Sequence, residues 1–163
     1  MKPTADRVRE LLDYNPLTGV FLWRVSPANN TPAGAIAGAD CDGYRLIRVA
    51  GGRYKGHQLA WLYMTGEWPS SRIDHIDTNR GNNTWTNLRY ATNSQNKANM
   101  GRRADNTSGF KGVRWYPTTK KWAAQIGFQG TRKNLGYFAT PEQAHAAYCE
   151  AASRLFGEFA RFE

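Results

Sequence analysis

The most constraining feature of the sequence is a polar stretch, residues 73–99, which begins with Asp74 and His75 and ends among closely spaced asparagines. Such a density of Asp, Asn and His is costly in a packed core, because each side chain must find a hydrogen-bond partner or stay in contact with water. A metal site is one way of satisfying these side chains. We therefore expect the rest of the chain to be organised around this stretch.

The stretch has the pattern of a β-hairpin followed by a helix. Residues 73–76 alternate apolar and polar side chains, which predicts a short strand, and a Gly/Asn-rich turn follows. A Thr-x-x-Gln capping box at Thr92 predicts that a helix begins there. Hairpin and helix together would bring Asp74 and Asn96 to the same place.

Carboxylate and amide oxygens at Asp74 and Asn96 suit Mg²⁺ or Mn²⁺ better than zinc. His75 would then remain unligated and could take a proton from water, as in phosphodiester hydrolysis. The alternative is that the Asp and Asn residues only form turns and caps, and for isolated asparagines this interpretation is favoured. The combination of Asp74 and His75 with Asn87 and Asn96 in a basic protein favours the site.

The charge balance indicates a polyanionic partner. The chain has 163 residues, with 22 Lys and Arg against 13 Asp and Glu, a formal net charge of +9. Nucleic acid is the first expectation and an anionic membrane surface the second. No apolar run approaches the ~20 residues of a spanning helix, and no apolar segment follows the amino terminus, so an intracellular protein is expected. Two cysteines are too few for a disulfide scaffold or a cysteine-ligated zinc site.

The amino-terminal part predicts a helix capped by Thr4, with Val8, Leu11 and Leu12 on one face, and then short strands and a basic hairpin over residues 44–55. The hairpin cations either contact phosphate or keep a solvated edge from aggregating, and both interpretations are open. The next segment predicts a short helix with His57, for which a structural role is favoured over a DNA contact. The four hairpin cations are Arg45, Arg48, Arg53 and Lys55.

A polar, basic linker at residues 101–107 precedes a second module. Three short strands are predicted over residues 110–114, 121–128 and 132–138, and Thr140 followed by proline predicts the start of a helix. An alanine-rich stripe on that helix would let it pack closely on the sheet. Because the strands are basic and the helix carries acids, the exposed sheet face is expected to meet nucleic acid.

The polar stretch resembles the HNH nuclease motif, a ββα-metal finger. The resemblance is carried by the Asp-His pair on the first strand, an Asn-Leu-Arg sequence after the turn and a Gln-Asn-x-x-Asn sequence on the helix. It implies that Asp74 and Asn96 bind one divalent metal ion, that His75 is the general base, and that Asn87 holds the loop and orients the histidine. Many relatives have Asp-Asn-Arg-Trp where residues 82–85 are Asn-Asn-Thr-Trp, which implies altered support of the turn.

Residues 108–159 resemble an AP2 DNA-binding domain, through the sequences GFKGVR, WAAQI and LGYF and an Ala-Ala-Tyr sequence on the helix. Plant AP2 domains often use Arg or Trp where this chain has Tyr116, Gly127 and Asn134, so their target sequence cannot be transferred. Besides the hairpin cations, the expected DNA contacts are Arg89, Asn99, Arg102, Arg103, Lys111, Arg114, Lys121, Gln125 and Arg132.

The expected fold is mixed α+β. An amino-terminal helix and β-hairpins lead into the ββα-metal motif, and a three-stranded antiparallel sheet packed on one helix follows. The expected domains are a nuclease domain at residues 1–100, with a leader at 1–65 and a core at 66–100, a linker at 101–107, and an AP2-like domain at 108–163.

The predicted function is that of a phage homing-type HNH endonuclease, which nicks or cleaves double-stranded DNA with one Mg²⁺ (or Mn²⁺) ion. A monomer in the cytoplasm of a bacterial host is expected, with no membrane partner and no small-molecule cofactor besides the metal. The alternative is a non-catalytic DNA-binding regulator that retains an HNH remnant. A structured-RNA binder is disfavoured, because no RNA-binding module or its aromatic signature is visible.

Overall fold

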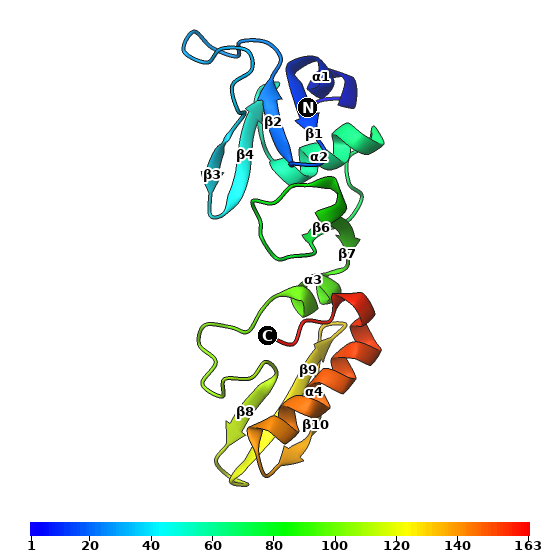
Figure 1. Cartoon of the computed structure of the whole chain (residues 1–163). Helices are drawn as coiled ribbons and strands as arrows, with labels where there is room; N and C mark the ends of the chain where they lie inside the picture. The colour runs from blue at the N-terminus through cyan, green and yellow to red at the C-terminus, as the bar shows by residue number, and fades with distance from the viewer. The chain divides into compact units, whose positions relative to one another are not determined.

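The computed structural model describes residues 1–163, and the contacts within the chain separate it into two units, Met1–Tyr90 and Ala91–Glu163. Each unit combines helices with small antiparallel sheets (Figure 1), which confirms the expected mixed α+β class. None of the helices has the length and apolar character required to span a bilayer.

The first unit contains three small sheets, β1–β2, β3–β4–β5 and β6–β7, and two helices. A short 3-10 turn, Trp85–Asn87, leads into β7. The elements in chain order are α1 Ala5–Leu11, β1 Leu12–Asn15, β2 Val20–Trp23, β3 Ala39–Cys41, β4 Tyr44–Val49, β5 Gly52–Lys55, α2 Gly56–Thr65, β6 Arg72–His75 and β7 Leu88–Ala91.

Strand β1 differs from the expectation, which placed Leu12 on the first helix. The helix ends at Leu11, and Leu12 pairs with Trp23 of β2. Alternate residues of β1 are buried, and Tyr14 stacks on Phe21 with ring centroids 4.6 Å apart. Packing of these apolar side chains in the core therefore overrides the continuation of the helical pattern.

The second unit packs one long helix on a three-stranded sheet. Its elements are α3 Asn93–Asn99, β8 Val113–Tyr116, β9 Lys121–Phe128, β10 Thr131–Phe138, α4 Pro141–Phe156 and the 3-10 turn Gly157–Phe159. Helix α4 crosses one face of the β10–β9–β8 sheet (Figure 1). It begins as predicted, with Thr140 Oγ1 accepting the backbone N–H of Gln143 at 3.3 Å and Pro141 in the first turn.

The helix approaches the loop before β8 so closely that only glycine fits there. Gly112 has a φ of +76°, and a Cβ at this position would lie 2.1 Å from the ring of Tyr148. Tyr148 is buried with Ile126 and Ala151 in the core between sheet and helix. The close approach of Tyr148 therefore explains the glycine of the Lys-Gly-Val sequence, which is part of the AP2 resemblance.

Helix α3 belongs to the second unit, although the sequence grouped it with the nuclease motif. Ala98 is 6% exposed and packs in one cluster with Ile126, Phe156 and Phe159. The contacts thus place α3 and residues 101–107 in the second unit, while the division into functional domains expected from the sequence stays a prediction.

Candidate nuclease site and DNA-binding surfaces

Strands β6 and β7 place Asp74 and Arg89 side by side in the first unit. Arg89 Nε donates a hydrogen bond to Asp74 Oδ2 at 3.2 Å, and the two side chains are 13% and 5% exposed. This ion pair restrains the orientation of the carboxylate. The structure thus places Arg89, which the resemblance implied as a DNA contact, against the candidate metal ligand.

His75 ends strand β6 and lies in a buried pocket of the first unit. Its Nε2 atom is 3.2 Å from Oδ1 of Asn83, and both residues are buried. The Asn83 amide nitrogen donates to the carbonyl of Gly81, so Oδ1 faces the imidazole and accepts the Nε2 proton. The proton-accepting nitrogen in this tautomer is Nδ1.

The surroundings of His75 favour its neutral form. Burial lowers the pKa of the imidazole, while the hydrogen bond that it donates to Asn83 and the carboxylates of Asp77 and Asp74 act in the opposite direction, and Arg80 lowers the pKa further. With its pKa below the ordinary value, the side chain is neutral at pH 7. A neutral imidazole is the state required of a general base.

Asn87 holds the loop that precedes it. Its Nδ2 donates to Asp77 Oδ1 and to the carbonyl of Asn82, each at 2.9 Å, and its Oδ1 accepts the backbone N–H of Asp77 at 3.0 Å. His75 instead donates a hydrogen bond to Oδ1 of Asn83. In the sequence, Asn83 is part of a Gly/Asn-rich turn, and the order of polar residues there does not indicate that its side chain is buried.

Two further aromatic side chains surround the catalytic candidate. His57, in the first turn of α2, contacts His75 edge to face, with ring centroids 5.0 Å apart and planes at 87°. Tyr44 lies 5.6 Å from His57 and 6.3 Å from His75 between ring centroids. Burial lowers the pKa of His57 to about 3, with smaller contributions from His75 and Lys55. His57 Nδ1 is buried without a hydrogen-bond partner.

Three of the four hairpin cations lie on the same face of the β3–β4–β5 sheet as Tyr44. Arg48 and Arg53 are exposed and directly opposite each other, and Lys55 Nζ lies 3.6 Å from the centre of the Tyr44 ring. Arg80 lies over the same ring at 5.1 Å. Arg45 points to the other face, where Nε donates to the carbonyl of Ala37. A cationic strip (Arg48, Arg53, Lys55 and Arg80) thus extends over the sheet to Tyr44, which adjoins His75.

The candidate metal ligands occupy different units. Asp74 lies on β6 in the first unit, and Asn96 lies, partly exposed, on α3 in the second. That they meet stays a prediction. No group of three or more His, Cys, Asp or Glu side chains is placed to hold a metal ion.

The open face of the second unit's sheet gathers four of the expected DNA contacts. Trp122, Ala124 and Ile126 pack toward α4, so the alternate side chains of β9 point away from the helix. Pairing with β8 and β10 brings further polar and aromatic side chains to this face, and Arg114 lies over the ring of Tyr116 at 5.4 Å. The four expected contacts on this open sheet face are Arg114, Lys121, Gln125 and Arg132.

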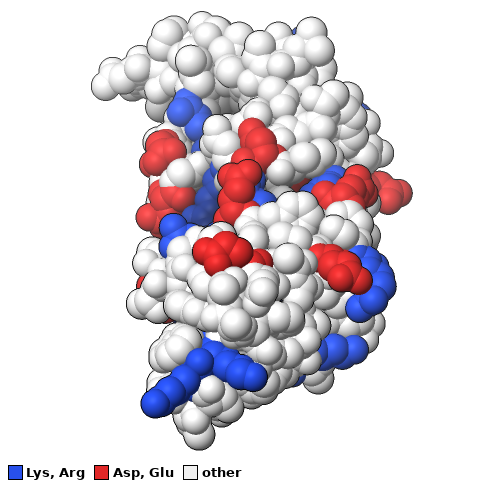
Figure 2. All heavy atoms as spheres, turned by 60° about the horizontal axis from the view of Figure 1, so that its bottom comes forward, with Lys and Arg blue, Asp and Glu red and all other residues white.

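The acids of the second unit lie away from that face. Glu142 and Glu150 are exposed on α4, which covers the opposite side of the sheet. On the face of the molecule drawn in Figure 2, acidic side chains lie among the basic ones. The sheet and helix therefore present surfaces of different charge.

In a comparison with known protein families, residues 54–98 match the HNH endonuclease family and residues 108–158 match the AP2 domain family. The chain is also 34% identical over 107 residues to Protein 3.8 of Escherichia phage T7, a match that covers 65% of this chain and 88% of that protein. The chain belongs to the HNH endonuclease family and carries a C-terminal AP2 domain. The resemblance to both families is thereby confirmed.

A second relative of the chain is an uncharacterized HNH endonuclease of Acanthamoeba polyphaga mimivirus. The two are 37% identical over 111 residues, which is 67% of this chain and 57% of the viral protein. The chain thus spans little more than half the length of that relative. No solved structure matches the chain.

Within the AP2 domain, Lys111 is the exception among the expected DNA contacts. Its ammonium donates to the backbone carbonyls of Ala98, Met100 and Arg161, at 2.5, 2.6 and 2.8 Å. Burial, followed by the nearby Arg161, lowers the pKa of Lys111 to about 8. The side chain therefore lies inside the second unit and not on the open sheet face.

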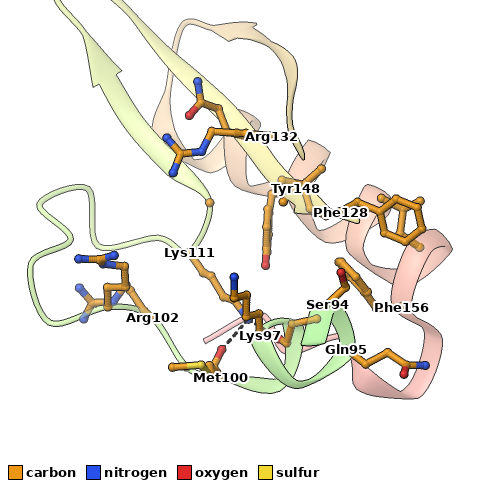
Figure 3. Close-up of a pocket in the computed structure, with 18 of the residues that line it drawn as sticks. Ser94, Gln95, Lys97, Met100, Arg102, Lys111, Phe128, Arg132, Tyr148 and Phe156 are labelled. Carbon is orange, nitrogen blue, oxygen red and sulfur yellow. Dashed lines mark hydrogen bonds between the residues drawn. The ribbon is translucent and has the colours of Figure 1, made fainter. Parts of the chain in front are cut away.

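A groove of about 1880 Å³ runs beside Lys111, between α3, the segment after it and the end of the sheet (Figure 3). Arg102 and Arg132 line it from the segment and the sheet. Arg103 also lines it, but both of its hydrogen bonds go to the carboxylate of Asp105. Asn99, implied as a backbone contact, is 6% exposed.

Proposed function

We propose that this protein is a metal-dependent endonuclease of the homing type, which hydrolyses phosphodiester bonds in double-stranded DNA. His75 is the general base, Asp74 and Asn96 bind one Mg²⁺ or Mn²⁺ ion, and Asn87 holds the loop beside the base. Residues 1–100 supply the nuclease and residues 108–163 supply DNA recognition. The observation that carries the proposal is the buried, neutral His75 fixed by Asn83 next to Asp74 on one strand.

His75 has the properties that its role requires. A neutral imidazole can take the proton of a water that attacks phosphorus, and its fixed orientation aims one nitrogen at that water. The cations of Arg80 and Lys55 at the neighbouring Tyr44 ring are suited to holding the phosphate close to the base. These groups combine a proton acceptor and a phosphate-binding surface.

The candidate ligands fit a hard divalent cation. Asp74 offers a carboxylate that also pairs with the guanidinium of Arg89, and Asn96 offers an amide oxygen. Mg²⁺ characteristically takes one or two oxygen ligands from the protein and keeps several waters, whereas a zinc site needs three or four nitrogen or sulfur ligands. A bound Mg²⁺ would stabilise negative charge on the phosphate oxygens and on the leaving oxygen.

Two basic surfaces support double-stranded DNA as the substrate. One is the cationic strip next to His75, and the other is the open sheet face of the AP2 domain. A two- or three-stranded sheet can enter the major groove, and phosphate contacts from Lys and Arg supply most of the affinity. The relative from Escherichia phage T7 supports a phage origin and the cytoplasm of a bacterial host as the setting.

Cleavage of supercoiled plasmid by the purified chain tests the proposal. Cutting is expected with Mg²⁺ or Mn²⁺ and not with chelator, and His75→Ala should lower the rate by about 10²–10⁴-fold while DNA binding persists. His145→Gln, which replaces the histidine of the other unit, is the matched control and should cut normally. Cutting by His75→Ala at the control rate would remove His75 from the mechanism.

The same experiment tests the alternative of a non-catalytic regulator. A regulator would bind DNA and leave the plasmid intact with either metal, and His75→Ala would then change nothing. Sequencing the ends from a random-site library would report the site and distinguish a nick from a double-strand break.

A further inference from the structure

Helix α3 carries the candidate metal ligand Asn96, and the side chain of Lys111 binds the backbone at its carboxyl end. Lys111 Nζ donates to the carbonyls of Ala98 and Met100, where the helix ends, and to Arg161 near the end of the chain. Figure 3 shows the lysine reaching from the start of the domain to Met100. An ammonium has three protons, so all of its donors are engaged.

Two other contacts fix the rest of the helix. Near its amino end, Ser94 Oγ accepts the backbone N–H of Gln129, in the turn between β9 and β10, at 3.1 Å. Next to its carboxyl end, the side chain of Ala98 is buried in one cluster with Phe156 and Phe159. The helix is thus attached at both ends to different elements of one unit.

The positive charge of Lys111 also interacts favourably with the carboxyl end of the helix. The last carbonyls of a helix lack partners within it and carry partial negative charge, so an ammonium there is stabilising. The helix has only seven residues and is too short to be stable by itself, which makes its position depend on such outside contacts.

We propose that Lys111 is a positioning residue, which fixes the helix bearing Asn96 to the AP2 domain so that the DNA-recognition domain carries one ligand of the metal site. This inference rests on the proposed function for the role of Asn96. Its consequence is that docking of the AP2 domain on DNA also restrains a ligand needed for cutting. Lys111 thereby contributes to a coupling between DNA recognition and metal binding.

The full-length variant Lys111→Met keeps the length of the side chain and removes its donors. Amide hydrogen exchange in metal-free protein should become at least about tenfold faster in the last turn of α3, with β9 unchanged. DNA affinity should stay within about twofold of wild type, and the Mg²⁺ concentration for half-maximal cutting should rise by about 10–100-fold. Ser94→Ala, a milder change at the other end, should shift both quantities in the same direction without unfolding the domain.

Each contrary result has a separate meaning. Unchanged exchange in α3 would overturn the positioning role, and loss of DNA affinity comparable to that of Arg114→Ala would make Lys111 a DNA contact instead. Faster exchange with an unchanged Mg²⁺ requirement would overturn the link to Asn96. A wild-type chain that never cuts would overturn the proposed function and this link with it, while the exchange measurement would still decide how α3 is attached.

Discussion

Asn83 Oδ1 accepts a hydrogen bond from Nε2 of His75 at 3.2 Å, and this contact assigns the tautomer of the imidazole. Asn83 is itself held, because its Nδ2 donates to Gly81 and a Cβ on Gly56 would lie 2.8 Å from that nitrogen. The amide is thus confined on two sides. Its role is to keep Nδ1 of His75 as the nitrogen that accepts a proton.

Replacing Asn83 should impair cutting without abolishing it. Asn83→Ala removes the acceptor that holds Nε2 of the ring, so we expect the cleavage rate to fall by at least about tenfold, but by less than the 10²–10⁴-fold of removing the base. Asn83→Asp places a carboxylate at Nε2, which raises the pKa of His75 and moves the acid limb of the pH–rate profile to higher pH. Single-turnover cleavage across pH measures both effects.

Asn82→Ala is the control for these variants. Its side chain bonds Asp77 and Thr84 in the same loop and does not contact the imidazole. A similar loss of rate in Asn82→Ala and Asn83→Ala, with no change in the pH profile of Asn83→Asp, would assign Asn83 to the loop alone.

His57 should make the first unit sensitive to acid. Its pKa is about 3 in the folded chain against about 6.5 when unfolded, so between these values only the unfolded chain takes up the proton. Stability is therefore lost as pH falls from about 6.5 toward 3, by about 2 kcal/mol at pH 5 from this group. The lowered pKa of His75 acts in the same direction.

His57→Phe keeps the ring against His75 and removes the titrating group. Urea unfolding at pH 7 and pH 5 should show a smaller loss of stability for this variant than for wild type, with His145→Gln as the control. An equal loss in His57→Phe and wild type would exclude His57 as the source of the acid sensitivity.

The parts of this molecule that the sequence predicts are those with local patterns. Strand β9 and the start of α4 follow from alternation and capping, and the adjacency of Asp74 and His75 follows from one short motif. The position of Lys111 could not be predicted, because its acceptors lie in two separate segments, at Ala98 and Met100 and at Arg161. The contact between Asn83 and His75 depends on the path of an irregular loop, which no periodicity encodes. Leu12 lies on strand β1 and not on the predicted helix, because its packing in the core outweighs its helix propensity.

Arg48 and Arg53 are expected to lower the stability of the folded chain and to increase its affinity for DNA. They are exposed and directly opposite on β4 and β5, where like charges are destabilising by roughly 0.2–1 kcal/mol. Arg48→Ala should therefore stabilise the chain by about that amount and weaken DNA binding. If Arg48 contacts one phosphate, the slope of log affinity against log salt should decrease by about 0.9.

Arg45→Ala is expected to behave in the opposite way. Arg45 lies on the same strand but faces away, and its hydrogen bond to Ala37 contributes about 1 kcal/mol to stability. This variant should lose stability and keep the wild-type salt slope. If both variants changed the slope equally, binding would depend on net charge and not on the cationic strip.

The final prediction concerns the open sheet face of the AP2 domain, where neighbouring residues of β10 provide a matched pair. Arg132 pairs with Gly127 on the open face, whereas Lys133 pairs with Ile126 on the helix side and lies over the ring of Phe128. Both substitutions to alanine remove one positive charge from the same strand. Arg132→Ala should weaken DNA binding at low salt and decrease the salt slope by about 0.9, while Lys133→Ala should leave the slope unchanged. Equal slopes for the two variants would place the DNA on some other surface of the domain.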